Sequence, residues 1–227
     1  MKRNLEIMMA VVLLVLAFFL SRQGAMLASG QKQEKNKGYV VVIDPGHGGK
    51  DPGKVGVSGV LEMEINLQIA KRLKLLLEAE DVTVVLTRDS DDGLYQESDR
   101  NKKVADMRAR CALIADVQPD VVISIHQNSY HEEGVKGAQC FYHTSSKEAK
   151  ELADLLQEQF GKMDDNNKRQ TQANSSYYLL KKTEVPTVIV ECGFLSNWEE
   201  EGKLTQESYQ EQLAWGMHLA ILKYLNR

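Results

Sequence analysis

Short apolar runs alternate with longer segments of helical periodicity along the chain after residue 38. The apolar runs, rich in β-branched residues, have the length of buried strands. They cover residues 39–43, 82–86, 121–125, 138–142 and 187–190. Because strands that alternate with helices are typical of α/β proteins with a largely parallel sheet, the pattern predicts that class of fold.

Helical segments lie between and after these runs. Apolar side chains recur every three or four positions in residues 61–80, 97–115 and 207–225. A Ser145-x-x-Glu148 pattern is a capping box, which predicts the start of a further helix. Residues 161–176, rich in Asn, Asp, Lys and Gln, predict a long surface loop. We expect residues 39–227 to form a single three-layer α/β domain, with a mostly parallel, twisted sheet of about six strands flanked by helices.

The first 38 residues have a different character. A basic start at Lys2 and Arg3 is followed by 14 uninterrupted apolar residues, 7–20. That length suits the apolar core of a signal peptide better than a membrane span, for which about 20 residues are needed. Residues 1–30 are therefore predicted to be a signal peptide or an uncleaved membrane anchor, and the polar, Lys-rich residues 31–38 a linker. Either alternative places the domain outside the cytoplasm, secreted or anchored to the outer face of the membrane.

Charge is distributed unevenly along the 227 residues. The net charge is −4, but residues 1–37 carry six Lys and Arg against two Glu, which leaves 22 basic and 30 acidic residues in the rest. An acidic domain does not attract nucleic acid or an anionic membrane, so we expect no nucleic-acid partner and membrane contact only through the leader. The three cysteines, Cys111, Cys140 and Cys192, form no CxxC pair, and we expect them in the core.

Polar side chains follow three of the apolar runs. His47 comes shortly after the first run, His126 directly after the third, and Glu191 directly after the last. Since ligands bind beyond the carboxyl ends of parallel strands, these side chains are expected to meet at one edge of the sheet. Glu62 joins them at the start of the apolar stripe of the next helix, where an uncompensated buried charge costs several kcal/mol.

A divalent metal ion would compensate that charge. Two imidazoles and one carboxylate are a common zinc set that leaves one position open, and Glu191 would then be free to act as a base. A different interpretation stays open, because a single histidine after a strand is more often hydrogen bonded than metal bound. The sequence also contains no HExxH, the local signature of many zinc proteases.

The glycine-rich segment after the first strand also matches a phosphate loop. Gly48 to Lys54 reads GxxxxGK, but Val55 stands where a Ser or Thr should bind Mg²⁺, and the helix is expected only about six residues later. This interpretation is disfavoured. The glycines are instead expected to let the backbone pass close to an ion and a substrate.

Four separated motifs follow one another along the domain. They are Asp44-Pro-Gly-His-Gly-Gly49, Gly59-Val-Leu-Glu62 with Asn66-Leu67, Ser124-Ile-His-Gln-Asn128 and Val190-Glu-Cys-Gly-Phe-Leu-Ser-Asn197. In this order they resemble the zinc-dependent N-acetylmuramoyl-L-alanine amidases of bacterial cell walls, from about Tyr39 to the C-terminus. With its membrane leader and without wall-binding repeats, the chain is most similar to the short spore-type amidases that act on cortex peptidoglycan.

The resemblance implies a reaction and a set of site residues. The reaction is hydrolysis of the amide between the lactyl group of N-acetylmuramic acid and L-alanine of the peptidoglycan stem peptide. The resemblance assigns one zinc ion per domain to His47, Glu62 and His126, and makes Glu191 the catalytic carboxylate. These assignments agree with the expected meeting of the four side chains at the sheet edge.

Five further residues carry weaker expectations. Asp44 and Asn128 are candidates for hydrogen bonds that orient the ligand imidazoles, although Asp44 is equally suited to capping the Pro-Gly turn. Arg88 is expected to be a structural ion-pair residue. Tyr177 and Tyr178 either stack on a sugar or pack on the domain, and packing is favoured because aromatic burial is the commoner use.

The spore-type likeness also implies partners. It suggests a role in cortex maturation, in which muramic lactam forms with a companion deacetylase, and an accessory protein that the enzyme requires. Two other functions stay open at this point: a non-catalytic wall-binding or regulatory protein with the same fold, and a zinc peptidase that cuts within the stem peptide.

Overall fold

Six strands form one sheet in residues 38–227, the part of the chain that this computed structural model describes. They are β1 (Val40–Pro45), β2 (Thr83–Leu86), β3 (Val121–Asn128), β4 (Gln139–Tyr142), β5 (Gln172–Ala173) and β6 (Thr187–Phe194). Their order in the sheet is β2-β1-β3-β6-β4-β5. Neighbours are parallel except for β4, which runs antiparallel to β6. The predicted class, a mostly parallel α/β sheet, is confirmed.

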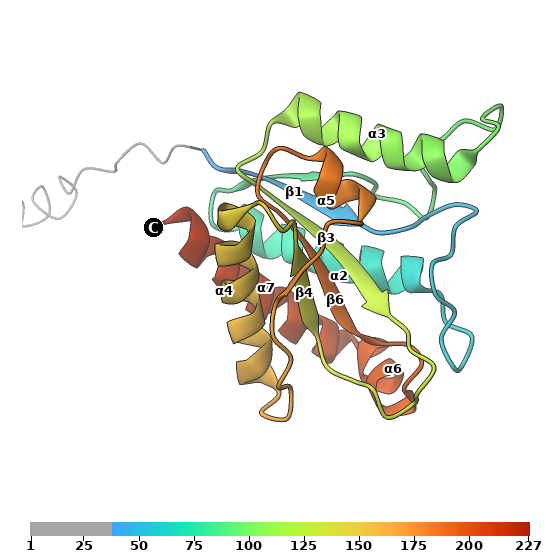
Figure 1. Cartoon of the computed structure of the whole chain (residues 1–227), viewed down its shortest axis with the longest axis vertical. Coiled ribbons are helices and arrows are strands. Elements are labelled where there is room, and N and C mark those ends of the chain that lie inside the picture. Colours follow the sequence, from blue (N-terminus) through green and yellow to red (C-terminus); the bar gives the residue numbers. More distant parts are fainter. Residues whose placement is uncertain (1–37) are drawn as a thin grey trace, which may run out of the picture. The chain divides into compact units, whose positions relative to one another are not determined.

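Helices cover both faces of this sheet (Figure 1). One face carries α2 (Glu62–Glu78), α4 (Lys147–Met163) and α7 (Glu207–Leu225), whose apolar side chains form the main core with alternate residues of the strands. The opposite face carries α3 (Lys102–Val117) and the short α5 (Tyr178–Lys182). Another short helix, α6 (Trp198–Leu204), follows β6. This three-layer arrangement buries both faces of the central strands, which explains why those strands are continuous apolar runs.

Two central strands are longer than their apolar runs predict. β3 continues through His126 to Asn128, and β6 continues through Glu191 to Phe194. His126 and Glu191 lie opposite each other in the register between these strands. The backbone ladder does not depend on side-chain polarity, so it persists after the apolar residues stop. Both side chains are therefore held by strand backbone and not by loops.

The helix boundaries show where local patterns mislead. The helix expected from residue 97 begins at Lys102, after Asn101 accepts a hydrogen bond from the Val104 backbone N–H at 3.1 Å. The third helix is capped by Ser146, whose hydroxyl accepts from the Ala149 N–H at 3.1 Å. The predicted cap, Ser145, is wrong by one residue, because its hydroxyl is hydrogen bonded to the His143 ring instead.

The predicted leader and linker fall on residues 1–37 and lie outside the described residues. Tyr39–Arg227 form a compact unit of their own. Across the described range, each helix is too short or too polar to cross a membrane.

Candidate active site

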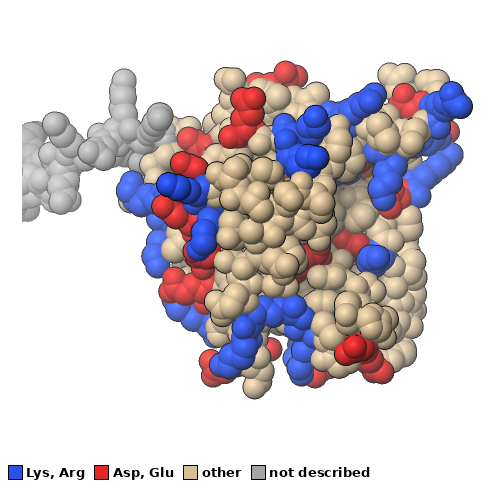
Figure 2. Space-filling view, in the orientation of Figure 1, with Lys and Arg blue, Asp and Glu red and all other residues tan. Residues whose placement is uncertain are grey.

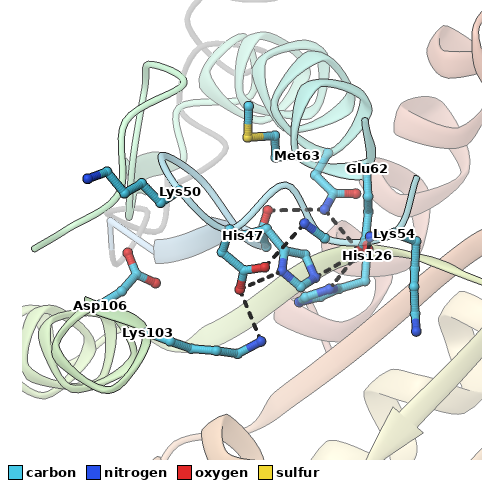
Figure 3. Close-up of polar contacts among 12 residues, drawn as sticks. His47, Lys50, Lys54, Glu62, Met63, Lys103, Asp106 and His126 are labelled. Atoms are coloured by element: carbon cyan, nitrogen blue, oxygen red, sulfur yellow. Dashed lines mark hydrogen bonds and ion pairs between the residues drawn. The ribbon is translucent and has the colours of Figure 1, made fainter. Parts of the chain in front are cut away.

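The ends of β1 and β3 and the start of α2 bring three side chains together (Figure 3). His47 Nε2 lies 3.2 Å, and His126 Nδ1 lies 3.0 Å, from Oε1 of Glu62. The imidazole rings meet edge to face, with centroids 4.9 Å apart. One potential ligand atom from each residue lies within 4.8 Å of the others. The structure thus brings together the three side chains that the sequence analysis proposed as metal ligands.

The turn after β1 has glycine at positions where the backbone lies too close to these side chains for a Cβ atom. A Cβ on Gly46 would lie between 2.2 and 2.6 Å from three atoms of the His126 ring. Gly53 has a φ of +71°, and a Cβ there would lie 2.5 Å from Glu62 Oε2. His47 itself has a φ of +65°, a left-handed conformation that residues other than glycine rarely adopt. The close approach expected of the glycines is present, and the imidazole of His47 is held by an unusual backbone conformation.

Glu62 is an ionised carboxylate although it is almost fully buried. Besides the two imidazoles, Oε1 accepts the Gln127 backbone N–H at 3.0 Å, and Oε2 accepts the Lys54 N–H at 2.7 Å. Burial alone would raise the pKa of this carboxyl, but its hydrogen bonds and charge interactions with His126 and His47 hold the pKa far below the ordinary value.

These donors fit a divalent metal ion. Imidazole nitrogens and a carboxylate oxygen are ligands that zinc accepts, and three protein ligands leave a position for water or substrate. The three residues line a cleft of about 490 Å³, which is large enough to admit a substrate to that position.

Glu191 faces the same cleft from β6. It is 9% exposed, and its Oε2 has no hydrogen-bond partner within residues 38–227. Burial raises the pKa of this carboxyl to about 7; the positive charge of His126 opposes the rise and the negative charge of Glu62 adds to it. A carboxyl with a pKa near neutrality can both take up and release a proton at physiological pH.

Asp44 lies near the end of β1, and its hydrogen-bond partners are residues other than the ligand imidazoles. Its carboxylate accepts hydrogen bonds of 2.6 Å each from the Thr87 and Ser124 hydroxyls and from Arg110 Nη1. Burial raises the pKa of Asp44, but the charge of Arg110 and these hydrogen bonds outweigh burial and lower it to about 2. The expectation that Asp44 orients an imidazole is wrong, because Arg110 is a stronger partner for a buried carboxylate.

Arg110 and Arg88 donate hydrogen bonds to backbone carbonyl oxygens of the turn that contains His47. Arg110 donates to the carbonyl oxygens of Pro45 at 2.8 Å and His47 at 2.5 Å. Arg88 donates to those of Pro45 and Gly46, both at 3.0 Å. Its remaining bonds go to the carbonyls of Met63 and Ser90. Arg88 was expected to form an ion pair. Within residues 38–227 its hydrogen bonds all go to backbone carbonyl oxygens instead.

Asp51 provides the contact to a ligand imidazole that Asp44 and Asn128 were expected to make. Its Oδ2 lies 3.1 Å from His47 Nδ1. Asn128 instead accepts the N–H of its neighbour Ser129 at 2.8 Å, so its expected contact is not formed either. The only sequence signal for Asp51 was its place four residues after His47 in a glycine-rich segment. The structure adds paired hydrogen bonds between Gly48 and Asp51 that close this turn.

The two tyrosines behave differently. Tyr177 is half-buried and packs edge to face on Phe141, with ring centroids 5.6 Å apart, as expected. Tyr178 is 41% exposed, and both tyrosines line the cleft. The other histidines, at positions 131, 143 and 218, are outside the cleft lining. Cys140 and Cys192 are buried in the core as expected, whereas Cys111 is only partly buried at its edge.

Comparisons with known proteins agree on one family. The family model described as N-acetylmuramoyl-L-alanine amidase matches residues 41–223. A germination-specific N-acetylmuramoyl-L-alanine amidase of Bacillus subtilis (strain 168) is 33% identical over 190 residues, which cover 82% of this chain and 80% of that protein.

Solved structures give the same result. The CwlD amidase from Clostridioides difficile, solved in complex with the GerS lipoprotein, is 36% identical with a TM-score of 0.81, covering 83% of this chain and 98% of that one. An N-acetylmuramoyl-L-alanine amidase from Clostridium difficile 630 is 32% identical with a TM-score of 0.75, covering 84% of this chain and 98% of that one.

Proposed function

The chain belongs to the N-acetylmuramoyl-L-alanine amidase family, and from this premise we propose that it is a zinc enzyme acting on peptidoglycan. It hydrolyses the amide between the lactyl group of N-acetylmuramic acid and L-alanine of the stem peptide. The observation that carries the proposal is the position of Glu191, a buried carboxyl with a pKa near 7. It lies opposite His126 in the strand register and lines the same cleft as the His47, Glu62 and His126 donors.

The side chains of the site have different roles in hydrolysis of the amide. One zinc ion, held by the two histidines and Glu62, would polarise the carbonyl and make water more acidic. Glu191 accepts a proton from the attacking water and delivers it to the nitrogen of L-alanine, which leaves as a neutral amine while the lactyl group keeps the carboxylate. The low pKa of Glu62 keeps it ionised as a ligand, whereas the high pKa of Glu191 suits proton transfer.

The setting of this reaction is proposed from the relatives. One relative is named a germination-specific amidase and another a probable cell wall amidase. These names support action at the cell wall, outside the cytoplasm, and a role connected with spores. For that role we propose spore cortex maturation, in which muramic lactam forms with a companion deacetylase. Basic and acidic side chains are interspersed on the face in Figure 2, which fits a polysaccharide-peptide substrate better than nucleic acid.

We also propose an accessory protein, because the CwlD amidase was solved with a lipoprotein bound. The partner is expected to raise the zinc content or the activity of this chain. Measurement of both for the isolated chain tests this, since full zinc occupancy and full activity alone would contradict a required partner.

Digestion of purified sacculi tests the reaction itself. We expect new amino-terminal L-alanine and peptide-free glycan, and loss of both products after treatment with a strong chelator, with recovery when zinc is added back. A zinc peptidase would release other termini, and a non-catalytic wall-binding protein would release none. Either of those results would replace the proposed reaction.

Asp51 should tune zinc binding through His47. Replacement by asparagine keeps the shape but removes the negative charge 3.1 Å from Nδ1, so the imidazole becomes a weaker ligand. We expect zinc affinity to fall by about 10-fold to 100-fold, the range for loss of such partners. Competition with a fluorescent chelator measures it. Asp99→Asn, in the loop before α3 and outside the cleft lining, is the control, and equal affinities in both variants would rule out this role.

A further inference from the structure

Three cationic side chains line the cleft, and they differ in what they contact. Arg110 is buried and bound to Asp44 and Asp106. Lys103 Nζ lies 3.2 Å from Asp51. Lys54 is exposed, and its ammonium group takes part in no ion pair or hydrogen bond within the described range. One positive charge of the cleft is therefore available to a bound anion.

The backbone of Lys54 is fixed beside the proposed metal ligands. Its N–H donates to Glu62 Oε2 at 2.7 Å, and its carbonyl accepts the Glu62 N–H at 3.0 Å. In Figure 3 its side chain extends from beside His126, whereas that of Lys50 points away on the opposite side of the turn. The Lys54 charge also opposes the rise in the pKa of Glu191 that burial causes, so the two side chains interact electrostatically. The cation is thus positioned by a rigid turn, with only its side chain left to move.

The proposed substrate carries a free carboxylate close to the amide bond that is cut. In a peptidoglycan stem, the residue after L-alanine is a glutamate joined through its γ-carboxyl group, so its α-carboxylate is free. This carboxylate belongs to the residue that follows L-alanine, so it lies one residue beyond the bond that is cut. One residue corresponds to about 3.8 Å between consecutive Cα atoms. The Lys54 side chain starts from a backbone that is hydrogen bonded to Glu62, so we expect its ammonium group to reach such a carboxylate.

We propose that Lys54 binds the free α-carboxylate of the second stem residue and so makes the enzyme selective for stems in which this group is not amidated. The inference rests on the proposed function, because it assumes that the muramoyl-alanine bond occupies the cleft. Lys54 determines substrate specificity and does not take part in the chemical step, which belongs to the metal ligands and Glu191.

Two substrates that differ in one group test this. They are muramoyl tripeptides with glutamate or α-amidated glutamate at the second position. The full chain, loaded with zinc, is assayed on both as wild type, Lys54→Met, Lys54→Arg and Lys50→Met. Lys50 is a matched control, because it lies in the same turn outside the cleft lining and pairs with Glu97. Zinc content is measured for every variant.

We expect wild type and Lys50→Met to favour the acid over the amide by roughly fivefold to tenfold in kcat/KM, as for a charge-assisted contact that is partly exposed. Lys54→Met should lose this preference through a higher KM for the acid at unchanged zinc content, and Lys54→Arg should keep most of it. Equal rates of wild type on both substrates, or an unchanged preference in Lys54→Met, would overturn the proposal. If zinc-loaded wild type cleaves neither substrate nor sacculi, the proposed function itself fails, and this inference with it.

Discussion

Replacement of Glu191 by glutamine is expected to lower kcat by about 10²-fold to 10⁴-fold and to leave zinc bound. Glutamine keeps the size of the side chain but cannot take the proton from water or return it to the leaving amine. Glu191 does not belong to the three donors that converge at the sheet edge, so metal content should not change. Release of L-alanine amino termini from sacculi, measured beside zinc by atomic absorption, checks both parts of the result.

His126→Ala provides the contrast. It removes one of the three donors, and we expect it to lose zinc and turnover together. A Glu191→Gln enzyme with near wild-type kcat would disprove the role of Glu191 in proton transfer. Loss of zinc from Glu191→Gln would instead show that this carboxylate is a ligand.

Removal of the Arg110 guanidinium should cause the largest loss of stability. Arg110 is 1% exposed and forms contacts of 2.6 Å with both Asp44 and Asp106. Replacement by methionine keeps most of the volume but leaves two carboxylates and the carbonyls of Pro45 and His47 without this donor. Breaking a buried ion pair in this way costs about 3–5 kcal/mol. Urea unfolding of Arg110→Met, fitted with an unchanged m-value, measures the loss in free energy of unfolding.

Arg72→Met is the control for this measurement. Arg72 pairs with Glu207 and Glu211 at the surface of α2 and α7, and exposed pairs contribute about 1 kcal/mol or less. A loss in Arg110→Met no larger than that in Arg72→Met would mean that the buried pairs contribute little to stability.

Periodic, buried elements were predictable because their sequences repeat a physical pattern. The last helix spans residues 207–225, as its apolar spacing predicts, and all five predicted strands are present. The elements that were missed are short: α5, α6 and the two-residue β5, which lies within the predicted loop 161–176. Five or seven residues are too few to show a period, and such helices are held by tertiary packing, as with the buried Leu179 and Leu180 of α5.

Part of the site was also predictable from the sequence. Positions at strand ends identify His47, His126 and Glu191, because parallel strands deliver their carboxyl ends to one edge. The partners of Asp44 were not predictable, since Arg110 lies 66 positions further along the chain and no local spacing connects the two. Contacts of this kind depend on how α3 packs against the sheet, which a single sequence does not encode in any short pattern.

The carbonyl contacts of Arg88 and Arg110 also bear on whether the site needs its metal ion in order to form. Small zinc domains fold only when the ion is present, because nothing else holds their ligands in place. Here the protein's own guanidinium groups hold the turn that carries His47. We therefore expect the chain to fold without the ion and to bind it afterwards.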